Sequence, residues 1–119
     1  MVKWGRLAYD APTGWIASQI SAAAHHILAL RPDGTVVGWS GGSSFYNYWG
    51  EATPPPGLIA TQVAAGNQFS VALRPDGSVV VWGYTDGQNE VPEGLVATQI
   101  AAGFNHVLAL RPDGSVVAW

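Results

Sequence analysis

The chain has 119 residues, of which 48% are hydrophobic and 11% charged, a net charge of −3 and no cysteine. This length suits a single domain with one core. Five basic residues are too few for a surface that binds nucleic acid through its phosphates, and the lack of cysteine excludes disulfides, thiolate chemistry and cysteine-ligated zinc. No signal peptide or transmembrane segment is predicted, and the sequence leaves the cellular compartment open.

In chain order, a short N-terminal strand is followed by three similar units. The run "VKW" ends at Trp4, and later apolar runs end at Trp39, Trp82 and Trp119, at spacings of 35, 43 and 37 residues. We therefore divide the single domain 1–119 into an extra N-terminal strand, 1–4, and the units 5–39, 40–82 and 83–119. The tryptophans that end the units are predicted to pack between neighbouring units.

Each unit contains the same short strands in the same order. In the third unit the runs "ATQIA", "HVLAL" and "SVVAW" mix apolar and polar positions and are bounded by Gly, Pro or Asp. Alanine-rich segments such as "ATQIAA" meet a glycine or a turn too soon for a stable helix. The chain is therefore predicted to be all-β.

Two turn motifs separate these strands. The phrase "ALRPDGSVV" occupies 72–80 and 109–117, and "ALRPDGTVV" occupies 29–37. Proline presets the first corner of a turn, aspartate accepts the next position and glycine takes the left-handed position of a bulge, so we interpret this phrase as a hairpin loop. A second turn, written "APTGW", "PPPGL" or "VPEGL", leads into the next strand.

A repeat of about 37 residues with four short strands has the size of a β-propeller blade. The stretches "GFNHVLALRPDGSVVAW" at 103–119 and "WGYTDGQNEVPEGL" at 82–95 also resemble the repeats of the regulator-of-chromosome-condensation family, especially its short bacterial form. The resemblance implies a propeller, usually of seven blades, and protein partners. It does not imply guanine-nucleotide exchange, which in the family uses a full ring and insertions that this chain lacks. We predict three blades of four-stranded antiparallel sheet.

Three blades cannot close a ring, and an open arc leaves blade faces and sheet edges bare. We predict that oligomerisation completes the ring, with two chains forming a six-bladed homodimer. Val2, Trp4, Val117 and Trp119 are the candidate residues for closure between chains, because the C-terminal strand of one chain could continue in register into the N-terminus of the other. Three chains with nine blades, or a designed or excised fragment of a longer propeller, remain alternatives.

The second unit is longer than the third and carries a loop rich in Gly and Ser with four aromatic residues: Phe45, Tyr46, Tyr48 and Trp49. Loops on a rigid scaffold often carry binding, and aromatic residues are enriched at hot spots. We predict that this loop contacts another subunit or a ligand. A lectin-like function, with these rings against sugar faces, is an alternative.

No catalytic, cofactor-binding or metal-ligating set is predicted. His26 and His106 share one repeat position at which the second unit has Phe69, and this suits packing better than proton transfer. The carboxylates are scattered through turns, whereas a calcium site needs about six or more oxygens. The predicted function is therefore that of a non-enzymatic scaffold that binds itself and other proteins, without nucleic acid, membrane or cofactor.

Overall fold

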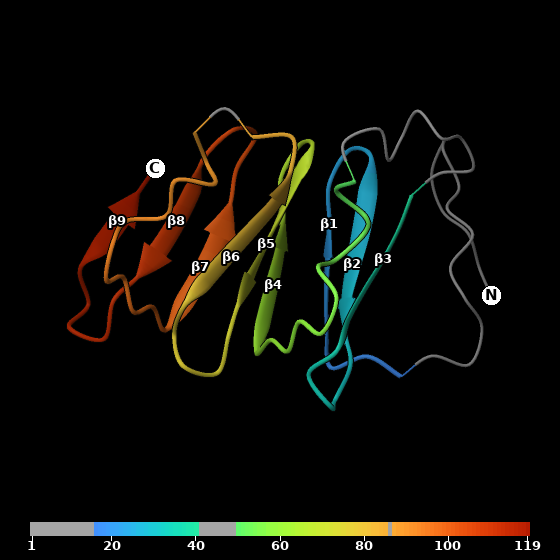
Figure 1. Cartoon of the computed structure of the whole chain (residues 1–119), viewed down its shortest axis with the longest axis horizontal. Helices are drawn as coiled ribbons and strands as arrows, with labels where there is room; N and C mark the ends of the chain where they lie inside the picture. The colour runs from blue at the N-terminus through green and yellow to red at the C-terminus, as the bar shows by residue number, and fades with distance from the viewer. Residues whose placement is uncertain (1–15, 41–49, 86) are drawn as a thin grey trace.

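The computed structural model describes residues 16–40, 50–85 and 87–119, which form strands and turns without a helix. Each unit contributes one antiparallel sheet whose three strands follow chain order. The first sheet has β1 (Gln19–Ala22), β2 (His26–Leu30) and β3 (Val36–Ser40), the second has β4 (Gln62–Ala65), β5 (Phe69–Leu73) and β6 (Val79–Gly83), and the third has β7 (Gln99–Ala102), β8 (Val107–Leu110) and β9 (Val116–Ala118). Figure 1 shows the sheets side by side. The prediction of an all-β chain with three propeller-like sheets is confirmed.

The number of strands per blade differs from the prediction. Four strands per blade were expected, and the described residues give three per sheet. Residues 54–58 and 91–95, which precede the second and third sheets, form turns in which Gly57 and Gly94 have φ of +75° and +73°. These segments contain proline, which lacks the N–H that a strand ladder requires. In the described part of the connection between the first and second sheets, Ile59 forms one isolated β-bridge with Thr35.

The repeated phrase forms the hairpin loop between the second and third strands of each sheet. Its glycines have positive φ, +89° at Gly34, +87° at Gly77 and +89° at Gly114. In the second sheet, the Asp76 carboxylate accepts hydrogen bonds from the Ser78 backbone N–H at 2.9 Å and the Ser78 hydroxyl at 2.6 Å, and the other two loops repeat this pair of bonds. The hydroxyl bond is the main reason that the pKa of each of these aspartates is lowered. The phrase is a turn module, as predicted.

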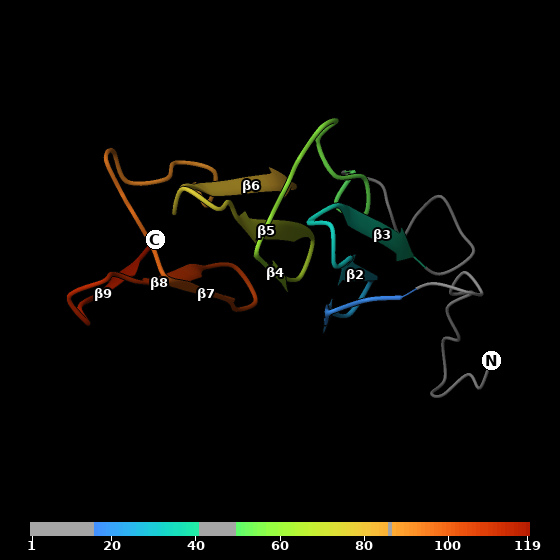
Figure 2. The same ribbon diagram turned by 90° about the horizontal axis from the view of Figure 1, so that it is seen from below.

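Two apolar clusters join neighbouring sheets, which follow one another along the long axis of the molecule (Figure 2). The cluster between the first and second sheets is built from Leu28, Leu30, Leu58, Ala60, Val63 and Ala72. The cluster between the second and third sheets is built from Ala64, Phe69, Val71, Leu73, Val79, Leu95, Ala97, Ile100, Val107 and Ala109. Trp82 packs against the first of these clusters and Trp119 against the second, so both tryptophans lie between sheets, as predicted.

A glutamine in the first strand of the first sheet and of the second sheet also ties each of them to the next sheet. Gln19 Oε1 accepts a hydrogen bond from the backbone N–H of Val63 at 2.8 Å. Gln62, at the same repeat position, accepts one from the N–H of Ile100 at 3.1 Å, and its Nε2 donates to the carbonyl of Thr98 at 3.0 Å. The two junctions between sheets therefore share one register.

Candidate functional site

Buried polar groups gather where the first sheet meets the second. His26 and Ser70 are fully buried, and Glu51 is 1% exposed. His26 Nε2 lies 2.7 Å from Ser70 Oγ, and this hydroxyl donates to the backbone carbonyl of Glu51, also at 2.7 Å. The same carbonyl accepts the indole N–H of Trp82 at 3.0 Å. These bonds tie β2, β5, β6 and the segment before β4 together at one point.

The hydrogen bonds assign the protonation of His26. The Ser70 hydroxyl has one hydrogen, which goes to the Glu51 carbonyl, so His26 Nε2 carries a proton and donates it to Ser70 Oγ. Burial, with a smaller contribution from the charge of His25, lowers the pKa of His26 to about 4, and the ring is neutral at pH 7. A serine nucleophile needs a histidine that accepts its proton. Here the histidine donates and both groups are buried, so the pair is a structural contact rather than a catalytic dyad.

The junction between the second and third sheets fills the same two positions with apolar side chains. Phe69 stands at the position of His26, and Val107 at that of Ser70, and both are buried in the second cluster. Sequence reasoning identified the histidine position and missed Ser70. The signal that could have found it is a hydroxyl at a position where the other units have Ile27 and Val107.

No described sheet packs over one face of the first sheet. Ile20 is 72% exposed, whereas Val63 and Ile100 at the same repeat position are 7% and 8% exposed because a preceding sheet packs over them.

On the third sheet it is the opposite face over which no sheet packs within the described part of the chain. Leu108 and Val116 are 37% and 64% exposed, whereas Val71 and Val79 at the same positions of the second sheet are 0% and 8% exposed. This face contains a shallow, mostly apolar pocket of about 200 Å³ formed by residues of β7, β8 and β9. We call the Ile20 face of the first sheet and the Leu108 face of the third sheet the two bare faces.

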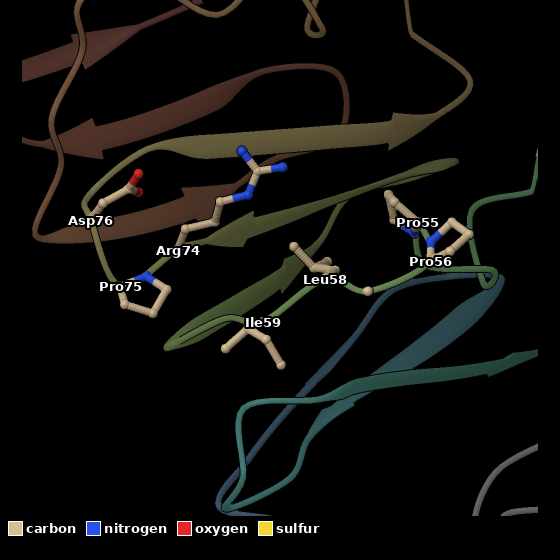
Figure 3. Close-up of a pocket in the computed structure, with 8 residues that line it drawn as sticks. Pro55, Pro56, Leu58, Ile59, Arg74, Pro75 and Asp76 are labelled. Atoms are coloured by element: carbon tan, nitrogen blue, oxygen red, sulfur yellow. The ribbon is translucent and has the colours of Figure 1, made fainter.

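A larger pocket, of about 400 Å³, lies where the two turn motifs of the second unit meet (Figure 3). One wall is formed by residues 55–59 and the other by Arg74, Pro75 and Asp76. The Asp76 carboxylate is already bound within its own hairpin loop. The lining supplies neither a histidine nor a nucleophile, so this pocket does not assemble an acid–base pair.

The remaining titratable residues do not converge. Within residues 16–40, 50–85 and 87–119, no three His, Asp or Glu side chains come together as metal ligands would. None of the described segments is a helix with the length and apolarity to cross a membrane.

Comparison with protein families identifies the repeat. Residues 60–89 and 97–119 match the family described as the regulator of chromosome condensation (RCC1) repeat. The second and third sheets of this chain are formed by RCC1-type propeller repeats. The matched residues include the whole of the second and third sheets. No curated protein sequence matches the chain.

Solved structures extend the likeness to nearly the whole chain. The ectodomain of the receptor kinase CR4 from Physcomitrella patens is 23% identical, with a TM-score of 0.79 over 98% of this chain and 32% of that one. The CRINKLY WD40 ectodomain of the Arabidopsis thaliana receptor kinase ACR4 is 20% identical, with a TM-score of 0.76 over 98% of this chain and 41% of that one. A match in the structure of Kap60 bound to yeast RCC1 (Prp20) is 25% identical, with a TM-score of 0.69 over 93% of this chain and 31% of that one. The chain thus spans between about a third and two fifths of the length of these proteins.

Of the residues predicted to form contacts between chains, two lie in the described part of the structure. Val117 and Trp119 border the cluster between the second and third sheets, and Trp119 Nε1 donates to the carbonyl of Gln88 at 2.6 Å. Both side chains therefore pack inside the chain, while β9, which contains Val117, is the outermost strand of its sheet. The other candidates, Val2, Trp4, Phe45, Tyr46, Tyr48 and Trp49, lie outside the described residues.

Proposed function

We propose that this chain is a non-enzymatic propeller module whose third sheet packs on the first sheet of a second copy, so that two chains form a six-bladed ring that serves protein binding. The observation that carries this proposal is that the two bare faces repeat the two faces that pack together inside the chain. The buried Ser70–His26 pair, which is arranged for structure rather than proton transfer, supports a non-enzymatic role.

The two bare faces should fit each other because they repeat two faces that pack together between sheets within the chain. Within the chain, Val71 and Val79 of the second sheet are covered by the third sheet. Leu108 and Val116 present the same kind of surface without a covering sheet among the described residues. The side chain that covers such a surface comes from the position of Ile100, which in the first sheet of a second copy is occupied by the exposed Ile20.

The glutamine that recurs in the first strand of each sheet would fix how the two copies align in this contact. Gln19 and Gln62 each accept the backbone N–H of the next sheet. Gln99, at the same position of the third sheet, is exposed, and its side chain makes no hydrogen bond with any described residue. In the proposed dimer, Gln99 Oε1 accepts the backbone N–H of Ile20 from the other copy.

A two-fold axis accounts for the number of copies. The contact joins one end of a chain to the opposite end of another, and two chains related by a two-fold axis make this contact twice. All four bare faces are then buried, which removes an aggregation hazard. A role in protein binding is supported by yeast RCC1 (Prp20), which shares the fold and has been seen bound to Kap60.

Sedimentation velocity at micromolar concentration tests this proposal. The wild-type chain should sediment as a dimer, and Leu108→Asp, which places a charge on the third-sheet face, should sediment as a monomer. Gln99→Ala should weaken the dimer roughly thirtyfold, since it removes one hydrogen bond of about 1 kcal/mol from each of the two contacts. Val96→Asp changes a side chain that is 50% exposed outside both bare faces, and this control should stay dimeric. A monomeric wild type, or a trimer with nine blades, would rule out the six-bladed dimer.

The aromatic loop keeps its predicted role in this proposal. Phe45, Tyr46, Tyr48 and Trp49 would contact the other subunit or a ligand of the ring. Changing Tyr46, Tyr48 and Trp49 together to alanine should weaken dimerisation or ligand binding. If both properties are unchanged, the loop has no part in the function.

A further inference from the structure

A smaller pocket, of about 160 Å³, opens between the second and third sheets. It is lined by the carboxamide residues Asn67, Gln68, Gln88 and Asn105 and by the aromatic residues Phe69, Tyr84 and Phe104. None of these side chains belongs to either bare face, and Phe69, which is 1% exposed and part of the cluster between the second and third sheets, forms the apolar floor. The pocket is therefore complete within one chain.

Hydrogen bonds fix the three segments that surround this pocket. The backbone N–H of Tyr84 donates to the carbonyl of Gln68 at 2.8 Å, and the N–H of Asn67 donates to the carbonyl of Phe104 at 3.4 Å. Gln88, which is 3% exposed, donates from Nε2 to the carbonyl of Asn105 at 2.8 Å. A pocket held in this way needs little reordering when a ligand binds.

Three of the carboxamides in the lining have no hydrogen-bond partner among the residues that the structure describes, whereas Gln88 is bound to the carbonyl of Asn105. The carboxamides of Asn67, Gln68 and Asn105 make no hydrogen bond with any residue that the structure describes. Each carboxamide offers both donors and an acceptor. A ligand with hydroxyl groups, which also donate and accept, would satisfy them, whereas a purely apolar ligand would bury them unpaired at a cost.

The aromatic rings and the uncharged lining of the pocket restrict the kind of ligand that it can bind. Tyr84 and Phe104 are 43% and 72% exposed, and Phe104 in particular presents a large apolar surface beside the pocket. The lining contains no Asp, Glu, Lys, Arg or His, and it offers no counter-charge to an ionised ligand. The pocket is about half the lower limit of roughly 300 Å³ for drug-sized ligands, which suits one six-membered ring.

We propose that this pocket binds a neutral pyranose sugar. The apolar face of the sugar ring lies against Phe104 and Tyr84, and its hydroxyl groups exchange hydrogen bonds with the carboxamides of Asn67, Gln68 and Asn105. A pyranose carries hydroxyl groups around its whole rim and can meet three carboxamides at once. A single peptide side chain lacks that number of polar groups, so a sugar fits this lining better than a peptide.

Titration of the full, ¹⁵N-labelled chain with methyl glycosides of glucose, galactose, mannose and N-acetylglucosamine tests the proposal by NMR. At least one sugar should shift the backbone amides of residues 67, 68, 84 and 105, with a Kd of about 1 mM as expected for so small a ligand. Phe104→Ala and Asn105→Ala should each weaken binding about tenfold. Tyr84→Phe keeps the ring and should bind nearly as well as the wild type. Ile59→Ala, a change at a side chain that is 44% exposed in the other pocket, should bind like the wild type.

Several results would overturn the sugar site. These are the absence of shifts with every sugar, shifts that persist unchanged in Phe104→Ala, and shifts at these amides with neutral peptides but not with sugars. The spectra of the variants report directly whether each is folded. Because the pocket lies within one chain, sugar binding should persist in the monomeric Leu108→Asp variant, and failure of the dimer and failure of this site are separate outcomes.

Discussion

Replacing Gln62 by alanine tests the register that joins neighbouring sheets. The Gln62 side chain makes two hydrogen bonds to the third sheet, from the Ile100 N–H at 3.1 Å and to the Thr98 carbonyl at 3.0 Å. Each such bond contributes about 1 kcal/mol net. Both are partly open to solvent, so Gln62→Ala should lower the free energy of unfolding by about 2 kcal/mol. For a domain of this size that corresponds to a fall in Tm of roughly 8 °C.

Gln99→Ala is the matched control, because it removes the same side chain from the same repeat position where no partner is found among the described residues. Thermal unfolding of both variants would be followed by circular dichroism over a range of protein concentrations. Gln62→Ala should lose stability at every concentration. Gln99→Ala should stay within about 0.5 kcal/mol of wild type when dilute and lose stability only where the dimer forms. Equal losses for the two variants at all concentrations, or no loss for Gln62→Ala, would refute this reasoning.

Further predictions concern the buried side chains between sheets. Ser70→Val should cost about 1–3 kcal/mol, since it leaves the buried His26 Nε2–H unpaired, and His26→Phe should cost less, since the Ser70 hydroxyl still donates to the Glu51 carbonyl. The double variant should recover most of the Ser70→Val loss in a urea-unfolding double-mutant cycle. The pKa of His26 is about 4 in the folded chain against an ordinary value of 6.5, so the unfolded chain binds the proton first as pH falls. Stability should therefore decrease by up to about 3 kcal/mol between pH 6.5 and 4, and His26→Phe should flatten this part of the profile in urea titrations. Gly66→Ala would place a methyl group against the buried ring of Phe69 and should cost about 1–3 kcal/mol by the same assay. The same change at Gly103, where the ring that it meets belongs to an exposed residue, should cost clearly less.

The parts of the fold that the sequence predicts are those specified by local chemistry. The Pro-Asp-Gly turn fixes each hairpin through a positive φ at glycine, and the tryptophans that end the second and third units, Trp82 and Trp119, pack between sheets. Both features depend on residues within one unit. They could be predicted because each repeats in all three units.

The parts that the sequence did not predict depend on contacts between units. Ser70 lies in β5, where every residue is buried because sheets cover both faces, so alternation gave no signal for its role. The pairing of Ser70 with His26 spans two sheets and is made once in the described residues. Gln62 occupies a polar position of an alternating strand and would be assigned to solvent, whereas its side chain binds the next sheet. A glutamine that recurs at one position in all three units was the available signal.

Site-specific crosslinking tests the six-bladed dimer most directly. The chain has no cysteine, so single cysteines can be introduced without interference. A mixture of the Gln99→Cys and Ile20→Cys chains, treated with a short bis-maleimide, should yield a covalent dimer rapidly, while either variant alone should not. The double variant Gln62→Cys and Ile100→Cys, which carries the equivalent pair within one chain, calibrates the reach of the reagent. If this internal pair crosslinks and the mixture remains monomeric, the ring is not completed by a second copy.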